Sequence, residues 1–175
     1  MDAFDVLALK PAFELDPTQL EQRYRDLQKQ LHPDKFAQAS ASEKRASLAR
    51  AVDVNQAYRA LRDEIKRAEI LLTRWTGAQS GTETTDPGLL MEVMELREGL
   101  AEAKAARDMR AVDALKSDVS ARERSAASTL REAFDVLARG SDGAARAEAH
   151  RALSQLRYYR RFQEEVARFE EDIAE

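Results

Sequence analysis

An amphipathic helix that a proline brings to an end is the feature that most constrains this chain. Four apolar residues recur at i, i+4, i+7 and i+11, and so share one face of a helix: Leu20, Tyr24, Leu27 and Leu31. Pro33 lacks the N–H that would continue the helix, and its ring pushes His32 out of the α region. The pattern therefore predicts a helix that ends at His32.

The residues around this proline form a compact polar tip. His32 can both donate and accept a hydrogen bond, and Asp34, two residues later, can only accept. Arg25 and Lys29 lie on the face of the helix opposite the apolar stripe. One interpretation of the tip is a recognition site on a basic helix. The alternative is an ordinary turn that follows a helix C-terminus.

Composition indicates an all-α protein. Hydrophobic residues make up 43% of the 175 residues and charged residues 34%, so the chain can bury a core despite its many charges. Glycine and proline number only 6 and 4. Good helix formers dominate, and no run of β-branched residues alternates with polar ones. The length suits one large or two small helical domains.

Several classes of function are disfavoured. The chain has no cysteine and only two histidines, His32 and His150, so we expect no metal and no cofactor. His150 has no evident partner and is interpreted as a surface residue of the last helix. No apolar stretch reaches membrane-spanning length, and Met1 runs almost directly into a helical pattern, so we expect a cytoplasmic protein without a leader and no membrane partner.

Charge is distributed unevenly along the chain. Residues 1–75 hold 13 Lys or Arg and 12 Asp or Glu, whereas the remainder holds 15 and 20. The first half is nearly neutral with a locally basic helix, and the second half is acidic. Binding to nucleic acid requires phosphate neutralisation, so we expect no nucleic-acid partner.

Residues 1–75 predict a first helical domain. A short helix is expected within 4–9, and Asp16-Pro17 starts the helix that runs to Leu31. After a loop at 37–41, Ser40 or Ser42 caps the next helix, and Asp63 caps a last one. The second helix should pack antiparallel on the first through a stripe on one side: Leu48, Ala51, Val52, Asn55 and Tyr58.

A polar, glycine-containing linker is expected at 76–86, and a second domain at 87–175. Asp86-Pro87 repeats the earlier helix start. Helices are predicted at about 88–104, 109–138 and 144–173, with short connections between them. Three helices joined in this way form an antiparallel bundle.

The first helix of this bundle carries more apolar residues than a core stripe needs. Its core face contains Leu89, Val93, Leu96 and Leu100. A second apolar group shares its sector with three carboxylates: Leu90, Met91 and Met94, with Glu95, Glu98 and Glu102. An apolar patch bordered by charge is typical of a protein interaction site. The alternative is that the patch packs against the first domain or against the long helix of the bundle.

The first domain resembles a J-domain, the module that stimulates ATP hydrolysis by DnaK-class chaperones. The resemblance rests on the basic helix, on His32-Pro33-Asp34 and on Gln56-Ala57-Tyr58-Arg59-Ala60-Leu61 in the next helix. It implies a chaperone contact through Arg25, Lys29, His32, Pro33 and Asp34.

Four further stretches carry a closer resemblance: Leu89 to Glu98, Asn55-Gln56-Ala57-Tyr58, Arg67 to Leu72 and Leu156-Arg157-Tyr158. With them, the whole chain resembles the HscB family, J-proteins of bacterial iron–sulfur cluster assembly. The resemblance implies that the bundle binds the scaffold protein IscU and that the J-domain delivers it to the chaperone HscA. The implied scaffold contacts are Leu90, Met91, Met94, Glu95, Glu98, Glu102 and Tyr158.

Two departures and two alternatives accompany this resemblance. Gly99 stands where the family commonly has a helix former, and Glu64 replaces a common proline. Eukaryotic relatives often carry an added cysteine-rich metal segment, and this chain has none, which favours a bacterial form. We expect a monomer that activates a chaperone ATPase and has no catalytic residues of its own. The alternatives are a general J-protein that presents unfolded clients, and an enzyme that uses His32 and Asp34 for acid–base chemistry.

Overall fold

The computed structural model describes residues 1–76, 86–140 and 142–174. Within these ranges every regular element is a helix, which confirms the all-α fold class. The chain divides into two compact units, residues 1–79 and 80–175, and each is described by itself. Most of the predicted linker, 76–86, lies outside the described residues. None of the described helices has the length and apolar character needed to span a bilayer.

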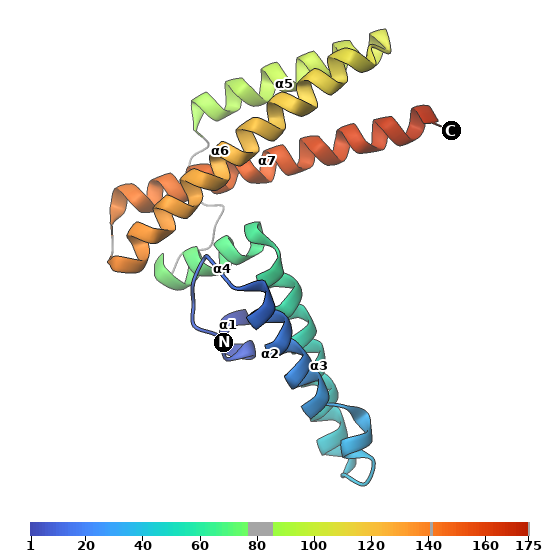
Figure 1. Ribbon diagram of the computed structural model, residues 1–175, viewed down its shortest axis with the longest axis vertical. Coiled ribbons are helices and arrows are strands. Elements are labelled where there is room, and N and C mark those ends of the chain that lie inside the picture. Colours follow the sequence, from blue (N-terminus) through green and yellow to red (C-terminus); the bar gives the residue numbers. More distant parts are fainter. Residues whose placement is uncertain (77–85, 141, 175) are drawn as a thin grey trace. The chain divides into compact units, whose positions relative to one another are not determined.

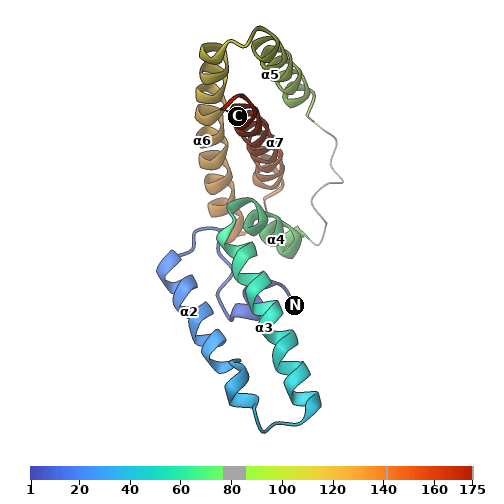
Figure 2. The same cartoon turned by 90° about the vertical axis from the view of Figure 1, so that its right-hand side faces the viewer.

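The first unit is built on an antiparallel helical hairpin, α2 and α3, with the polar turn at its outer end (Figures 1 and 2). Its elements are α1 (Ala3–Leu7), α2 (Pro17–Gln30), the 3₁₀ helix η1 (Pro33–Phe36), α3 (Ala41–Arg62) and α4 (Glu64–Thr76). Local chemistry determines where they begin. An Asp16 carboxylate oxygen accepts the Thr18 N–H at 2.8 Å, and Ser40 forms a capping box with Glu43.

The core of this unit shows that one expected stripe was partly wrong. Leu48 and Val52 of α3 are 66% and 46% exposed, although we expected both to face α2. The buried stripe of α3 lies about 120° further round the helix and contains Val54, Ala57 and Leu61. The physical reason is that α1 also packs against α3, so the buried face of α3 includes the side in contact with α1.

The expected contact between α2 and α3 is nonetheless present, and it is largely aromatic and polar. The rings of Tyr24 and Tyr58 stack with their centroids 4.1 Å apart. The Tyr24 hydroxyl donates to Asn55 Oδ1 at 2.9 Å, and the Gln28 amide donates to the same oxygen at 2.6 Å. Near the turn, the hydroxyl of the buried Ser47 donates to the Leu31 carbonyl at 3.4 Å.

The second unit is a bundle of three helices, α5 (Pro87–Ala106), α6 (Met109–Arg139) and α7 (Gly143–Ala174) (Figure 1). An aspartate begins each helix: Asp86, Asp108 and Asp142 accept backbone N–H groups of the first turn. Residue numbers in α5 and α7 increase in the same direction along their contact, because the Tyr158 hydroxyl meets the Val93 carbonyl and Lys104 meets Glu165. The intervening α6 therefore runs antiparallel to both.

The last helix also corrects one expectation. His150 is only 8% exposed, so it is not a surface residue as predicted. It stands among Ala149, Ala152 and Leu153, all of which are buried. The buried stripe on this part of α7 is therefore wide enough to include His150 beside small alanine side chains.

Candidate interaction surfaces

The His32-Pro33-Asp34 corner is exposed and stiffened by local hydrogen bonds. Pro33 opens η1, and the His32 carbonyl accepts the Lys35 N–H at 3.0 Å. His32 Nδ1 accepts the Asp34 N–H at 3.3 Å, which leaves Nε2 as the ring nitrogen that carries a proton and can donate. The His32 and Asp34 side chains are 59% and 90% exposed. The corner thus presents one donor and one carboxylate from a short, rigid turn.

The basic face of α2 leads up to this corner. Arg25 and Lys29 are exposed, and Arg25 Nε donates to Glu21 Oε1 at 2.8 Å. The other Glu21 oxygen accepts the Tyr58 hydroxyl. Hydrogen bonds from Tyr58 first, and then from Arg25, lower the pKa of Glu21, while the Glu21 hydrogen bond raises the pKa of Tyr58. Tyr58 of α3 therefore holds the carboxylate that orients Arg25 on α2.

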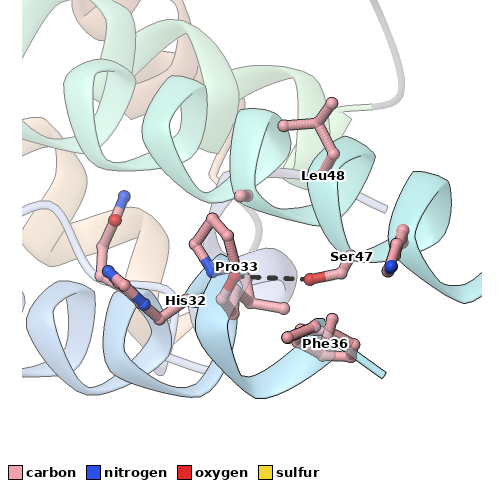
Figure 3. A pocket seen from close by; sticks show the side chains of 10 residues that line it. His32, Pro33, Phe36, Ser47 and Leu48 are labelled. Carbon is pink, nitrogen blue, oxygen red and sulfur yellow. Dashed lines mark hydrogen bonds between the residues drawn. The ribbon is translucent and has the colours of Figure 1, made fainter. Parts of the chain in front are cut away.

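An apolar pocket adjoins the corner, and sequence reasoning missed it. Its volume is about 440 Å³, and its lining includes His32, Pro33, Phe36, Ser47 and Leu48. Figure 3 shows Pro33 and Phe36 on the turn side and Leu48 on the side of α3. Leu48, which the spacing assigns to the hairpin core, is exposed and lines this pocket instead.

The bundle presents the second candidate surface on α5. Leu90, Met91 and Met94 are 51%, 65% and 63% exposed, so neither α6 nor α7 covers them. With a helical repeat of about 100° per residue, these three side chains and three carboxylates fall within a sector of about 140°. The carboxylates belong to Glu95, Glu98 and Glu102, and all three residues are exposed. We call these six residues the α5 face.

Tyr158 joins the α5 face to α7. The residue is half-buried, and its hydroxyl donates to the Val93 carbonyl at 3.2 Å. Burial raises the pKa of Tyr158. At about 100° per residue, Val93 lies just outside the exposed sector, on the Leu90 side. Tyr158 therefore lies at the edge of the α5 face, beside the residues with which the sequence expectation groups it.

A polar network holds α5 to the other two helices beneath this face. The Tyr159 hydroxyl of α7 donates to Glu92 Oε1 at 2.5 Å, and Arg122 Nη1 of α6 lies 3.0 Å from the same oxygen. Arg122 Nε also donates to Asp118 at 2.9 Å. The network links residues distant in sequence, so no local pattern could have revealed it. No group of three or more His, Asp or Glu side chains in the described ranges is placed to hold a metal ion.

Comparison with known proteins assigns both units. Residues 2–70 match the DnaJ domain model, and residues 85–167 match the HSCB C-terminal oligomerisation domain model. The Co-chaperone protein HscB homolog of Burkholderia cenocepacia is 42% identical over 153 residues, which cover 86% of this chain and 85% of that protein. The homolog of Paraburkholderia phytofirmans is 38% identical, with 93% and 90% coverage.

The chain belongs to the HscB family of co-chaperones.

Solved structures agree with this assignment. Chaperone HscB from Vibrio cholerae aligns with a TM-score of 0.78 and 33% identity, covering 98% of this chain and 99% of that one. Human co-chaperone protein HscB aligns with a TM-score of 0.80 and 28% identity, covering 95% and 81%. The first unit, with the hairpin and its His-Pro-Asp turn, is thus the J-domain. The bundle is the C-terminal helical domain of the HscB family.

Proposed function

We propose that this co-chaperone is a two-ended adaptor in iron–sulfur cluster assembly. The bundle binds the scaffold protein IscU, and the J-domain delivers it to the DnaK-class chaperone HscA and stimulates ATP hydrolysis there. In this proposal the protein acts as a cytoplasmic monomer and carries out no reaction itself. The observation that carries it is the uncovered α5 face in a chain whose other unit exposes a His-Pro-Asp corner.

The chaperone end is supported by exposure and charge. Arg25, Lys29 and the corner of His32, Pro33 and Asp34 are all exposed, on α2 and on the turn that follows it. Together they offer a donor and an acceptor that suit a polar surface, and cations that accelerate the encounter with an acidic one. Stimulation requires that the contact stabilise the hydrolysis-competent state of the chaperone more than its other state.

The scaffold end is supported by the chemistry of the α5 face. Methionine side chains are flexible and polarizable, so Met91 and Met94 can repack around a partner. The carboxylates of Glu95, Glu98 and Glu102 favour a partner surface that combines apolar and basic groups. Tyr158 adds an aromatic group at the edge, and its hydroxyl is already paired with Val93.

The scaffold contact is tested by calorimetric titration of IscU into the wild type and a Leu90→Ala/Met91→Ala/Met94→Ala variant. We expect the triple variant to bind at least about 100-fold more weakly, because three side chains at an interface centre lose their contacts. Val136→Ala is the matched control, since Val136 is an apolar bundle residue that is 42% exposed but lies on α6. Equal affinity of the triple variant and the control would place the scaffold site elsewhere.

The same variants separate the adaptor from a general J-protein. The methionines of the α5 face would also suit unfolded clients, so binding to a chemically denatured model protein is measured in parallel. The adaptor proposal predicts weaker binding to the denatured protein than to IscU. Equal affinity for both, abolished by the triple variant, would favour the general J-protein instead. Sedimentation of the free protein then checks the monomer.

A further inference from the structure

Arginines concentrate on the part of α7 that lies next to the α5 face. Residues 149–163 contain four arginines and no Asp or Glu, although residues 76–175 as a whole carry 20 acidic and 15 basic side chains. Arg151 is paired with Asp86 at 3.3 Å and with Glu148 at 3.2 Å. Arg161 is exposed, and no carboxylate in the part of the chain that the structure describes forms an ion pair with it.

A second exposed arginine, Arg97, lies on α5. Helix neighbours three and four positions away could pair with its charge, but all four are apolar: Val93, Met94, Leu100 and Ala101. Burial raises the pKa of Tyr158, whereas the charge of Arg97 acts to lower it, so Arg97 lies close to the Tyr158 hydroxyl. Arg97 thus stands beside the aromatic residue at the edge of the α5 face.

The contact between Tyr158 and Val93 brings these two arginines to the same height in the bundle. Arg97 follows Val93 by four residues, a rise of about 6 Å along α5. Arg161 follows Tyr158 by three residues, a rise of about 4.5 Å along α7. Because α5 and α7 run in the same direction along this contact, Arg97 and Arg161 flank it at nearly the same level.

Both arginines also lie on the outer side of this contact. On α5, Arg97 is only about 20° around the helix from Leu90, which is 51% exposed. On α7, Arg161 is turned about 60° to one side of Tyr158, and Tyr159 about 100° to the other side. Tyr159 belongs to the network beneath the α5 face, so the side that carries Arg161 faces outward. We call Arg97 and Arg161 the arginine pair.

The arginine pair requires an anionic group from any partner that covers it. Two neighbouring cations repel one another, and burying them without a counter-charge costs free energy. Glu165, one turn beyond Arg161 on α7, is already held by Lys104 at 2.7 Å. A partner that covers both Leu90 and Tyr158 also covers the pair, so it must supply a carboxylate of its own.

We propose that Arg97 and Arg161 together bind one carboxylate of the scaffold protein. This contact rests on the proposed scaffold binding at the α5 face. Guanidinium groups match the planar geometry of a carboxylate and bind it through paired hydrogen bonds. The glutamates of the α5 face select basic groups and the arginine pair selects an acidic one, so the scaffold is held in a single orientation. An unfolded client has no fixed arrangement of charges and gains less from this surface.

Calorimetric titration of IscU into full-length variants tests the arginine pair. The variants are Arg97→Gln, Arg161→Gln and the double variant that combines them. Arg124→Gln is the matched control, because Arg124 is an exposed arginine of the bundle that makes the same change in net charge. It lies on α6, about 160° around the helix from Arg122, which faces α5. Thermal unfolding verifies that each variant folds.

We expect each single variant to bind IscU about tenfold more weakly, because a charge-assisted hydrogen bond is lost. Arg124→Gln should match the wild type. Two side chains that share one ligand are coupled, so the loss in the double variant should differ by at least about threefold from the product of the two single losses. A double variant that follows the product would show that the arginines do not share a carboxylate, and would overturn the proposal.

The remaining outcomes separate the arginine pair from the scaffold contact itself. If Leu90→Ala/Met91→Ala/Met94→Ala loses IscU while Arg97→Gln and Arg161→Gln match Arg124→Gln, the pair fails and the scaffold contact stands. If the triple variant binds IscU like the wild type, the scaffold contact fails, and the pair with it.

Two other occupants are also tested. Inorganic phosphate that binds the wild type but not Arg161→Gln, with IscU affinity equal in both, would assign the pair to a small anion and overturn the proposal. Sedimentation that shows a wild-type dimer, dissociated by Arg161→Gln, would show that a second copy supplies the carboxylate, which also overturns it.

Discussion

Replacing Tyr159 by Phe tests whether the network beneath the α5 face holds α5 on the bundle. The variant keeps the ring, which is 2% exposed, and removes only the hydroxyl that donates to Glu92 at 2.5 Å. A hydrogen bond to a charged group contributes roughly 1.5–3 kcal/mol. Glu92 keeps Arg122 at 3.0 Å, so its charge is not left unpaired. We therefore expect a loss of about 2 kcal/mol in the free energy of unfolding.

The assay is differential scanning calorimetry of the full chain. For a unit of residues 80–175, a loss of about 2 kcal/mol lowers the bundle Tm by about 10 °C. Tyr158→Phe is the matched control: its hydroxyl donates to a neutral carbonyl at 3.2 Å, so it should cost about 1 kcal/mol or less. Equal losses for both variants would refute the role assigned to the network.

The same substitution changes how stability responds to alkaline pH. Burial first, and then the Glu92 hydrogen bond, raise the pKa of Tyr159 well above its usual range. The folded state therefore retains a proton that the unfolded state releases above about pH 10. This contribution to stability is complete below that pH and is lost as the pH rises further. The difference between the urea midpoints of unfolding at pH 8 and pH 10.5 should be smaller in Tyr159→Phe than in the wild type. An equal difference in both proteins would contradict this.

Two other predictions concern α5 and α2. Gly99→Ala should raise the free energy of unfolding by about 1 kcal/mol, because alanine favours the helix and its methyl group would lie 3.6 Å from Leu115 without a clash. Ala101→Gly, at an exposed position of the same helix, should lower the free energy of unfolding by a similar amount. A Gly99→Ala variant with a lower Tm would contradict the space seen beside Leu115. Arg25→Gln/Lys29→Gln should reduce the salt dependence of the rate of association with the chaperone more than the salt dependence of the dissociation rate. Both rates are measured by biolayer interferometry between about 50 and 300 mM salt. A wild-type rate that does not respond to salt would remove the electrostatic argument.

Local chemistry explains why so much of the fold was predictable from the sequence. Asp16, Ser40 and Asp86 begin helices where expected, because a cap depends only on the backbone N–H groups two or three residues later. The exposure of Leu90 and Met94 could also be predicted from their angular positions on the helix, because another stripe of the same helix already supplies the apolar side chains of the core.

Tertiary packing accounts for what the sequence did not predict. Leu48 belongs to an apolar stripe by spacing, and only the position of α1 against α3 shows that a different stripe is buried. Leu48 lines the pocket beside the corner instead. His150 looked like a surface residue because the width of the buried stripe on α7 depends on its neighbours. The contact of Tyr159 with Glu92 spans 67 residues of sequence.

In the proposed adaptor, one molecule must use both ends at once. Its most direct test is the ATPase rate of HscA with IscU and an equal mixture of two variants, His32→Gln and Leu90→Ala/Met91→Ala/Met94→Ala. Each variant keeps one proposed end. We expect the mixture to stimulate no more than the triple variant alone, while the wild type at the same concentration gives the full rate with IscU. A mixture that restores the wild-type rate would show that the two surfaces act independently, and would contradict the adaptor.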